Sequence, residues 1–204
     1  EKHHVSKIVT RKIAAYREKE NTRGAADLLN ARLAIVQNKP GEALDKARLA
    51  VQRLPDLGVP WRVLGEAAMT AELWGEAVTA LRKATTLGLK AQAGTWERLA
   101  DSLDELGELR NAEEAAREAL RLTKTDPHAR RRRLNALAAI LKHRGALDEA
   151  YDTVMKAHAI GPDDPAVLHN MAAIAEARGK SEEALALYRR AVSGVHPPMT
   201  DWRL

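Results

Sequence analysis

The sequence predicts an all-α protein built from repeated pairs of helices. Alanine and leucine dominate the 204 residues, phenylalanine is absent and aromatic residues make up 3%, a composition that suits closely packed helices better than sheets. Apolar residues recur three and four positions apart over most of the chain, which indicates amphipathic helices. Alanine pairs seven residues apart recur at Ala43/Ala50, Ala77/Ala84, Ala112/Ala119, Ala150/Ala157 and Ala184/Ala191. Their successive offsets of 34, 35, 38 and 34 residues indicate an α-solenoid of five helical hairpins.

Residues 1–23 are expected to form a basic amphipathic helix before the first hairpin. The turn-forming residues 21–24 are expected to end this helix. We interpret the segment as a cap on the first hairpin, and docking on a membrane surface or a partner is the alternative. Its apolar face would consist of Val5, Ile8, Val9, Ile13 and Tyr16.

Five hairpins of two helices each are expected to follow. The fifth begins with the clearest start signal, since Asp164 is a carboxylate N-cap and Pro165 occupies the first helical position. The 38-residue offset adds about one helical turn, so the first helix of the fourth hairpin should be a turn longer than the others. The predicted repeats are residues 24–57, 58–92, 93–126, 127–164 and 165–198.

Residues 199–204 read as the opening of a sixth repeat or as a capping tail. Trp202 falls 34 residues after Leu168, which is the repeat position that holds Trp61 and Trp96 in earlier hairpins. Together with the apolar face of the N-terminal helix, this tail suggests self-association through the terminal repeats.

The hairpins resemble those of the tetratricopeptide repeat family. The first hairpin is the poorest match, because Asp27 and Asn30 stand where bulky apolar residues are expected. The resemblance covers roughly residues 24–192 and implies a right-handed superhelix. The family pattern of Trp-x2-Leu-Gly-x2-Tyr…Ala-x3-Phe…Ala…Pro is met most closely by Trp61, Leu64, Gly65, Ala77, Leu81 and Ala84.

The resemblance also implies a binding groove, lined by the first helix of each hairpin and occupied by a peptide or a partner helix. The third hairpin would contribute an acidic band and the fourth a basic band, which would orient a charged partner. Recognition of chaperone C-termini is not expected, because Glu66, Glu97, Asp101 and Ala139 interrupt the lysine and asparagine clamp that it needs. The implied groove residues are Arg62, Glu66, Glu97, Arg98, Asp101, Asp104, Glu105, Arg132, Asn135, Lys142, His143, His169 and Asn170.

Neither a catalytic site nor a cofactor or metal site is expected. Cysteine is absent, the seven histidines lack metal-ligand spacing and the glycines mark turns. The net charge of +5 and the four arginines at 130–133 raise nucleic acid as a partner. Those arginines spread around a helix without aromatic residues to stack bases, so salt bridges to Glu113, Glu114 or Glu118 are favoured.

The sequence therefore predicts a non-catalytic scaffold or adaptor that binds another protein. The alternatives are a self-assembling scaffold of a membrane-associated or multiprotein complex, and binding of nucleic acid or another anionic partner through the basic segments. No apolar run reaches the length of a membrane span, so the chain is expected to be soluble. The cytoplasm is slightly favoured, and an extracytoplasmic or membrane-tethered parent is left open.

Overall fold

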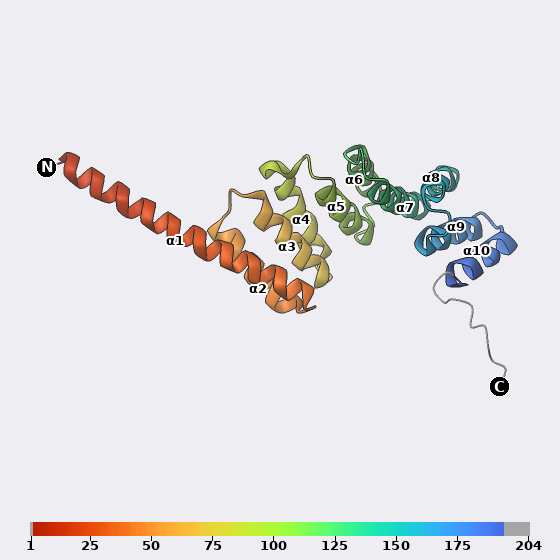
Figure 1. The fold of residues 1–204 in the computed structure, drawn as a ribbon, viewed down its shortest axis with the longest axis horizontal. Coiled ribbons are helices and arrows are strands. Elements are labelled where there is room, and N and C mark those ends of the chain that lie inside the picture. Colours follow the sequence, from red (N-terminus) through yellow and green to blue (C-terminus); the bar gives the residue numbers. More distant parts are fainter. Residues whose placement is uncertain (1, 194–204) are drawn as a thin grey trace, which may run out of the picture. The chain divides into compact units, whose positions relative to one another are not determined.

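The computed structural model describes the backbone of residues 2–193 and the side chains from residue 18 onward. Within this part, ten α-helices and one short π-helical turn account for the regular structure, and strands are absent (Figure 1). The chain divides into two compact units, Glu1–Ser102 and Leu103–Leu204. The elements are α1 (Lys2–Val36), α2 (Pro40–Arg53), α3 (Gly58–Thr70), α4 (Trp74–Ala84), η1 (Thr85–Leu89), α5 (Ala93–Glu105), α6 (Leu109–Arg121), α7 (Pro127–His143), α8 (Leu147–Ile160), α9 (Pro165–Ala177) and α10 (Ser181–Ser193).

In the first unit, small side chains let the helices approach closely. α1 packs on α2, α3 packs on α4, and α3 also contacts both α1 and α2. Gly65 of α3 has no side chain where it meets α4, and a Cβ built there would lie 2.6 Å from Cγ of Leu81. One core cluster joins the four helices through Ala31, Ala34, Ala43, Leu44, Ala47, Val63, Leu64, Ala67, Ala68, Ala77 and Ala80.

Two tryptophans of this unit make the same contact at equivalent positions. The indole N–H of Trp61 donates to the carbonyl of Pro55 at 2.8 Å. The indole N–H of Trp96 donates to the carbonyl of Lys90 at 2.9 Å. Each bond ties the first turn of a helix to the segment that precedes it, so these half-buried rings have a polar partner as well as an apolar one.

The N-terminal segment is not a separate cap, because α1 runs unbroken from Lys2 to Val36. The predicted turn at residues 21–24 is absent: Thr22 Oγ1 donates to the carbonyl of Glu18 at 2.9 Å inside the helix. Gly24 lies against α2, where a Cβ would come within 2.7 Å of Leu54. This glycine serves close packing and does not end the helix. The N-terminal half of α1 extends past the end of α2 (Figure 1). It continues the first helix of the first hairpin and is not a separate helix packed on that hairpin.

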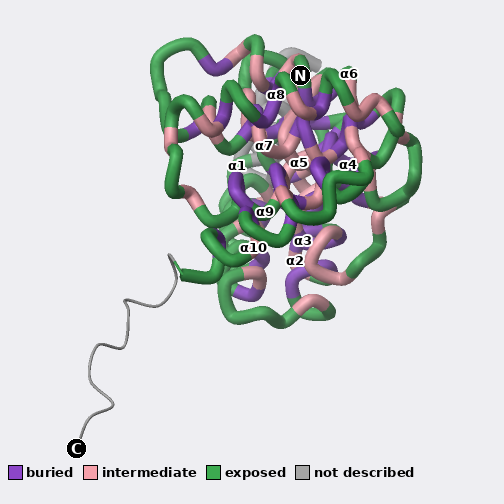
Figure 2. The backbone as a smooth tube through the Cα atoms, turned by 90° about the vertical axis from the view of Figure 1, so that its right-hand side faces the viewer, coloured by how far each residue is buried: buried purple, intermediate pink, exposed green. Residues whose placement is uncertain are grey.

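The second unit repeats the hairpin arrangement. α7 packs on α8 and α9 packs on α10, while α6–α7 and α8–α9 contacts join successive hairpins. α7 has 17 residues, four more than the 13 of α3 and α9. Buried and exposed residues alternate along the helices (Figure 2), as expected for amphipathic helices. The interior includes the fully buried Leu141, Val154, Val167 and Ile174.

Aspartates begin two of the helices of this unit. Asp126 accepts from the backbone N–H of Ala129 at 3.0 Å, and that bond lowers the pKa of Asp126. Asp164 accepts from the N–H groups of Ala166 and Val167 at 3.0 and 3.1 Å. Both therefore satisfy helix N-terminal donors that would otherwise lack an intrahelical partner.

Substituting Asp164 with alanine should lower the free energy of unfolding by about 1 kcal/mol, because the N-cap of α9 loses its acceptor. The change also removes the ion pair of Asp164 with Arg131, whose N–O distance is 2.8 Å. The neighbouring Asp163→Ala is the matched control, since Asp163 is exposed and caps no helix. Urea unfolding followed by circular dichroism measures both variants, and equal losses would contradict the capping role.

Candidate functional site

The thirteen predicted groove residues all lie on α3, α5, α7 and α9, the first helices of their hairpins. Several of them form polar pairs between successive first helices. These pairs are Glu66 with Arg98, Asp104 with His143, and Asn135 with Asn170. The sequence placed these residues on a common surface but did not predict that they contact one another.

In the first unit, one carboxylate is shared by two arginines. Glu66 of α3 forms an ion pair with Arg62 one turn away on the same helix. It also forms an ion pair with Arg98 on α5, whose Nε lies 2.9 Å from Oε1 of Glu66. Arg98 in turn donates to the carbonyl of Gly94 at 2.8 Å, which fixes its direction. Two cations on one carboxylate leave an excess positive charge at this point of the surface.

In the second unit, a histidine and an aspartate join α5 to α7. Nδ1 of His143 lies 2.9 Å from Oδ2 of Asp104 and 3.0 Å from its Oδ1. His143 is exposed and Asp104 is half-buried. Asp104 of the predicted acidic band is thus paired with His143 of the predicted basic band.

Two asparagines join α7 to α9 in the same unit. Nδ2 of Asn170 donates to Oδ1 of Asn135 at 3.0 Å, and its distance to the Asn135 carbonyl oxygen is 3.4 Å. Both side chains are half-buried. A primary amide carries two N–H donors and one carbonyl acceptor. The pair therefore presents an amide donor on Asn135 and an amide acceptor on Asn170 for a further partner.

His169 contacts its own hairpin. Its ring packs edge-on against Tyr188 of α10, with centroids 5.4 Å apart and planes at 64°. The hydroxyl of Tyr188 donates to Glu176 at 3.1 Å. Burial, and then this hydrogen bond, raise the pKa of Tyr188. These contacts hold His169 beside Asn170 on α9.

The other predicted groove residues belong to none of these pairs. Glu97 and Lys142 are half-buried, whereas Asp101, Glu105 and Arg132 are exposed. Within the part of the chain that the structure describes, no group of three or more acidic or histidine side chains is placed to hold a metal ion. None of the described helices is both long and apolar enough to cross a membrane.

Two segments of the chain match models of a known repeat family. Two tetratricopeptide repeat models match, one at residues 93–126 and one at residues 167–198. The chain contains tetratricopeptide repeats (TPR). No curated protein matches it by sequence.

Solved structures with the same fold cover nearly the whole chain. MamA 41-end from Desulfovibrio magneticus RS-1 has a TM-score of 0.74 at 13% identity, over 87% of this chain and 98% of that one. YrrB, described as a TPR protein with an unusual peptide-binding site, has a TM-score of 0.68 at 20% identity, over 92% and 93%. A Podosopora anserina putative kinesin light chain with TPR-like repeats has a TM-score of 0.74 at 16% identity, over 89% and 99%. The predicted α-solenoid fold class is confirmed.

Three of the four arginines at 130–133 have partners that the sequence did not indicate. Arg131 binds Asp164, the N-cap of α9. Arg133 is buried and donates to Oγ1 of Thr123 at 2.6 Å, and Arg130 lies 3.4 Å from the Thr123 carbonyl oxygen. Of the expected partners Glu113, Glu114 and Glu118, Glu113 binds Arg117 and Arg144 instead.

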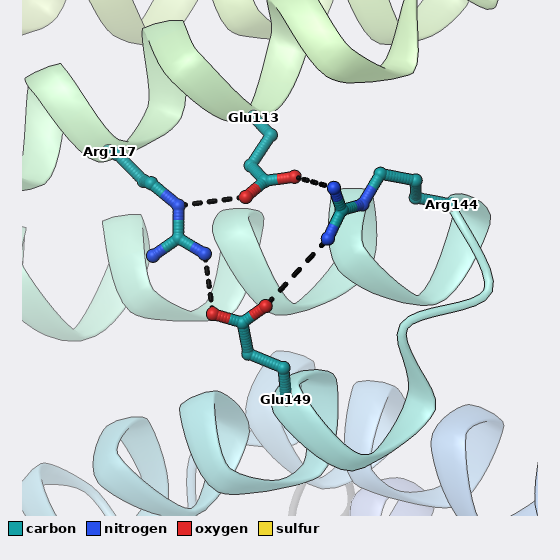
Figure 3. A network of polar contacts seen from close by, with 4 residues as sticks. All are labelled: Glu113, Arg117, Arg144 and Glu149. Carbon is teal, nitrogen blue, oxygen red and sulfur yellow. Dashed lines mark hydrogen bonds and ion pairs between the residues drawn. The ribbon is translucent and has the colours of Figure 1, made fainter.

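Glu113 belongs to a ring of four charged side chains that connects two successive hairpins (Figure 3). Arg117 binds Glu113, one turn away on the same helix, at 2.8 Å, and it also binds Glu149 of α8. Arg144, just after α7, binds Glu113 at 2.9 Å and lies 3.8 Å from Glu149. The hydrogen bond to Glu149 is the main reason that the pKa of Arg117 is raised. These ion pairs connect α6 to α8, the second helices of their hairpins.

Proposed function

We propose that this TPR protein is a non-catalytic scaffold, and that it holds an extended segment of another protein across α7 and α9. TPR repeats are interaction modules, and the structure of YrrB, which shares the fold, is described as having a peptide-binding site. The observation that carries the proposal is the Asn135–Asn170 pair, a polar contact between first helices of successive repeats.

The pair suits a peptide backbone because it offers complementary groups side by side. The amide N–H of Asn135 can donate to a peptide carbonyl, while the carbonyl oxygen of Asn170 can accept from the N–H of the same strand. Their mutual hydrogen bond of 3.0 Å fixes both side chains before a ligand arrives. Such preorganisation reduces the side-chain entropy lost on binding.

The neighbouring charges would select the partner's side chains. Asp104 and His143 form the adjacent polar pair on α5 and α7, and Lys142 lies beside His143 in sequence. A peptide with an acidic residue near its bound backbone would meet Lys142 and His143. Hydrogen bonds to the peptide backbone supply the affinity, and the charged side chains determine the direction in which the peptide binds.

The test selects peptides first and then removes the asparagines. A displayed library of random peptides is panned against the wild-type chain, and enriched peptides are titrated by fluorescence anisotropy. Asn135→Ala with Asn170→Ala should weaken binding about tenfold, since each lost hydrogen bond contributes roughly 0.5–1.5 kcal/mol. Asn111→Ala is the matched control, because Asn111 lies on the second helix α6 and binds Glu108. Unchanged affinity in the double variant, or a library without enriched peptides, would overturn the proposal.

A further inference from the structure

The first hairpin leaves a row of apolar side chains uncovered on α1. Leu29, Leu33 and Val36 are exposed, and Leu33 shows 54% of its surface to solvent. Their spacing of four and three residues puts them on one side of the helix. With Arg32, Ile35 and Glu66 they line a recess of about 340 Å³. We call this surface the α1 end face.

The repeat register shows what normally covers this position. Leu33 is 34 residues before Ala67, which is fully buried on α3. Ile140 and Ile174 lie at the same place in α7 and α9 and are also buried. α3 is covered by the hairpin that precedes it, through contacts with α1 and α2. The α1 end face therefore has the form of a junction surface whose covering hairpin is missing from the described residues.

The last described helix shows the other half of such a junction. Leu185 of α10 is 51% exposed, and Val192, seven residues later on the same side, is exposed too. We call these residues the α10 end face. The repeat offsets align Leu185 with Leu44 and Val78, which are both buried. Leu44 of α2 and Ala67 of α3 belong to the same core cluster, and α2 contacts α3.

We infer that a second copy of this chain docks end to end, with the α10 end face of one copy on the α1 end face of the next. The two end faces continue the internal junctions, because one chain carries both surfaces in the same repeat register. Leu185 and Leu33 would then belong to one apolar cluster, as Leu44 and Ala67 do. The contact is heterologous, so it can extend into longer assemblies. It goes beyond the proposed function and does not use Asn135 or Asn170.

The test blocks each end separately and then combines the two variants. Sedimentation of the wild-type chain should give a mass that rises with concentration. Leu33→Glu and Leu185→Glu should each weaken association about tenfold or more, because a charge would be buried in an apolar contact. An equimolar mixture of the two variants should recover dimers and nothing larger, since only one intact pair of end faces remains. Leu57→Glu is the matched control, because Leu57 is equally exposed, at 54%, but belongs to neither end face.

Several outcomes would overturn this inference. A wild-type chain that is monomeric over the whole concentration range would do so, and so would a Leu33→Glu variant that still self-associates as the wild type does. A mixture that stays monomeric would exclude the heterologous contact. Circular dichroism checks that both variants fold, which the exposure of the substituted leucines favours. The outcome is separable from the peptide titration, because Asn135→Ala with Asn170→Ala should leave assembly unchanged.

Discussion

Replacing Leu81 with alanine is expected to lower the free energy of unfolding by about 3 kcal/mol, within the usual range for a buried leucine. Leu81 on α4 is completely buried. Its branched end fills the space that the missing side chain of Gly65 leaves on α3, so shortening it would open a cavity between the two helices. Urea unfolding monitored by circular dichroism measures the loss. Leu73→Ala, at an exposed position next to α4, is the control and should cost much less.

The same contact predicts a change of sign for a substitution at Gly65. In the wild-type chain, Gly65→Ala should destabilise by about 1–3 kcal/mol, since the added Cβ would lie 2.6 Å from Cγ of Leu81. This loss outweighs the gain of about 1 kcal/mol in helix propensity. In the Leu81→Ala background the methyl enters the cavity, so Gly65→Ala should stabilise. Additive effects of the two substitutions would show that the side chains do not share this space.

The repeat pattern predicted this core because the responsible residues recur at a fixed period. Ala77, Leu81 and Ala84 stand at pattern positions, and all three are fully buried. Small side chains permit a close approach of helices and leucines fill the spaces between them, so composition and spacing together determine the packing. The start signals at Asp126 and Asp164 could be predicted for a similar reason, since an N-cap depends on residues next to it in sequence.

Partners that depend on three-dimensional neighbours could not be predicted in this way. The sequence predicts that the arginines at 130–133 pair with glutamates of the preceding hairpin, whereas Arg131 binds Asp164, the N-cap of α9. A glycine is ambiguous for the same reason: the sequence predicts a turn at Gly24, but this glycine packs against Leu54, thirty residues away in sequence. In the candidate site, the register placed Asn135 and Asn170 on first helices but could not indicate that they bind each other. The exposure of Leu29, Leu33 and Val36 could not be predicted, because residues 1–23 were expected to form a cap that covers the first hairpin.

The first hairpin shows how a poor match to the pattern is compensated. Asp27 stands 34 residues before Trp61, at a position where the repeat has a bulky apolar residue. The side chain of Asp27 is buried and forms an ion pair with Arg53 of α2. Arg53 also lies 3.4 Å from Glu20 on α1. A polar clamp between α1 and α2 thus replaces the apolar contact that the other hairpins use.

Replacing Asp27 with alanine is therefore expected to lower the free energy of unfolding by about 2 kcal/mol. Breaking a fully buried ion pair costs roughly 3–5 kcal/mol, and the loss here is smaller because the Arg53 side chain is partly exposed and keeps Glu20. The paired change Asp27→Leu with Arg53→Leu should recover most of the stability, since apolar residues can fill a site vacated by both charges. Asp56→Ala, at an exposed position beyond α2, is the control for loss of a carboxylate. If urea unfolding gave Asp27→Ala the stability of the wild type, the clamp would contribute nothing and the first hairpin would be held by its alanines alone.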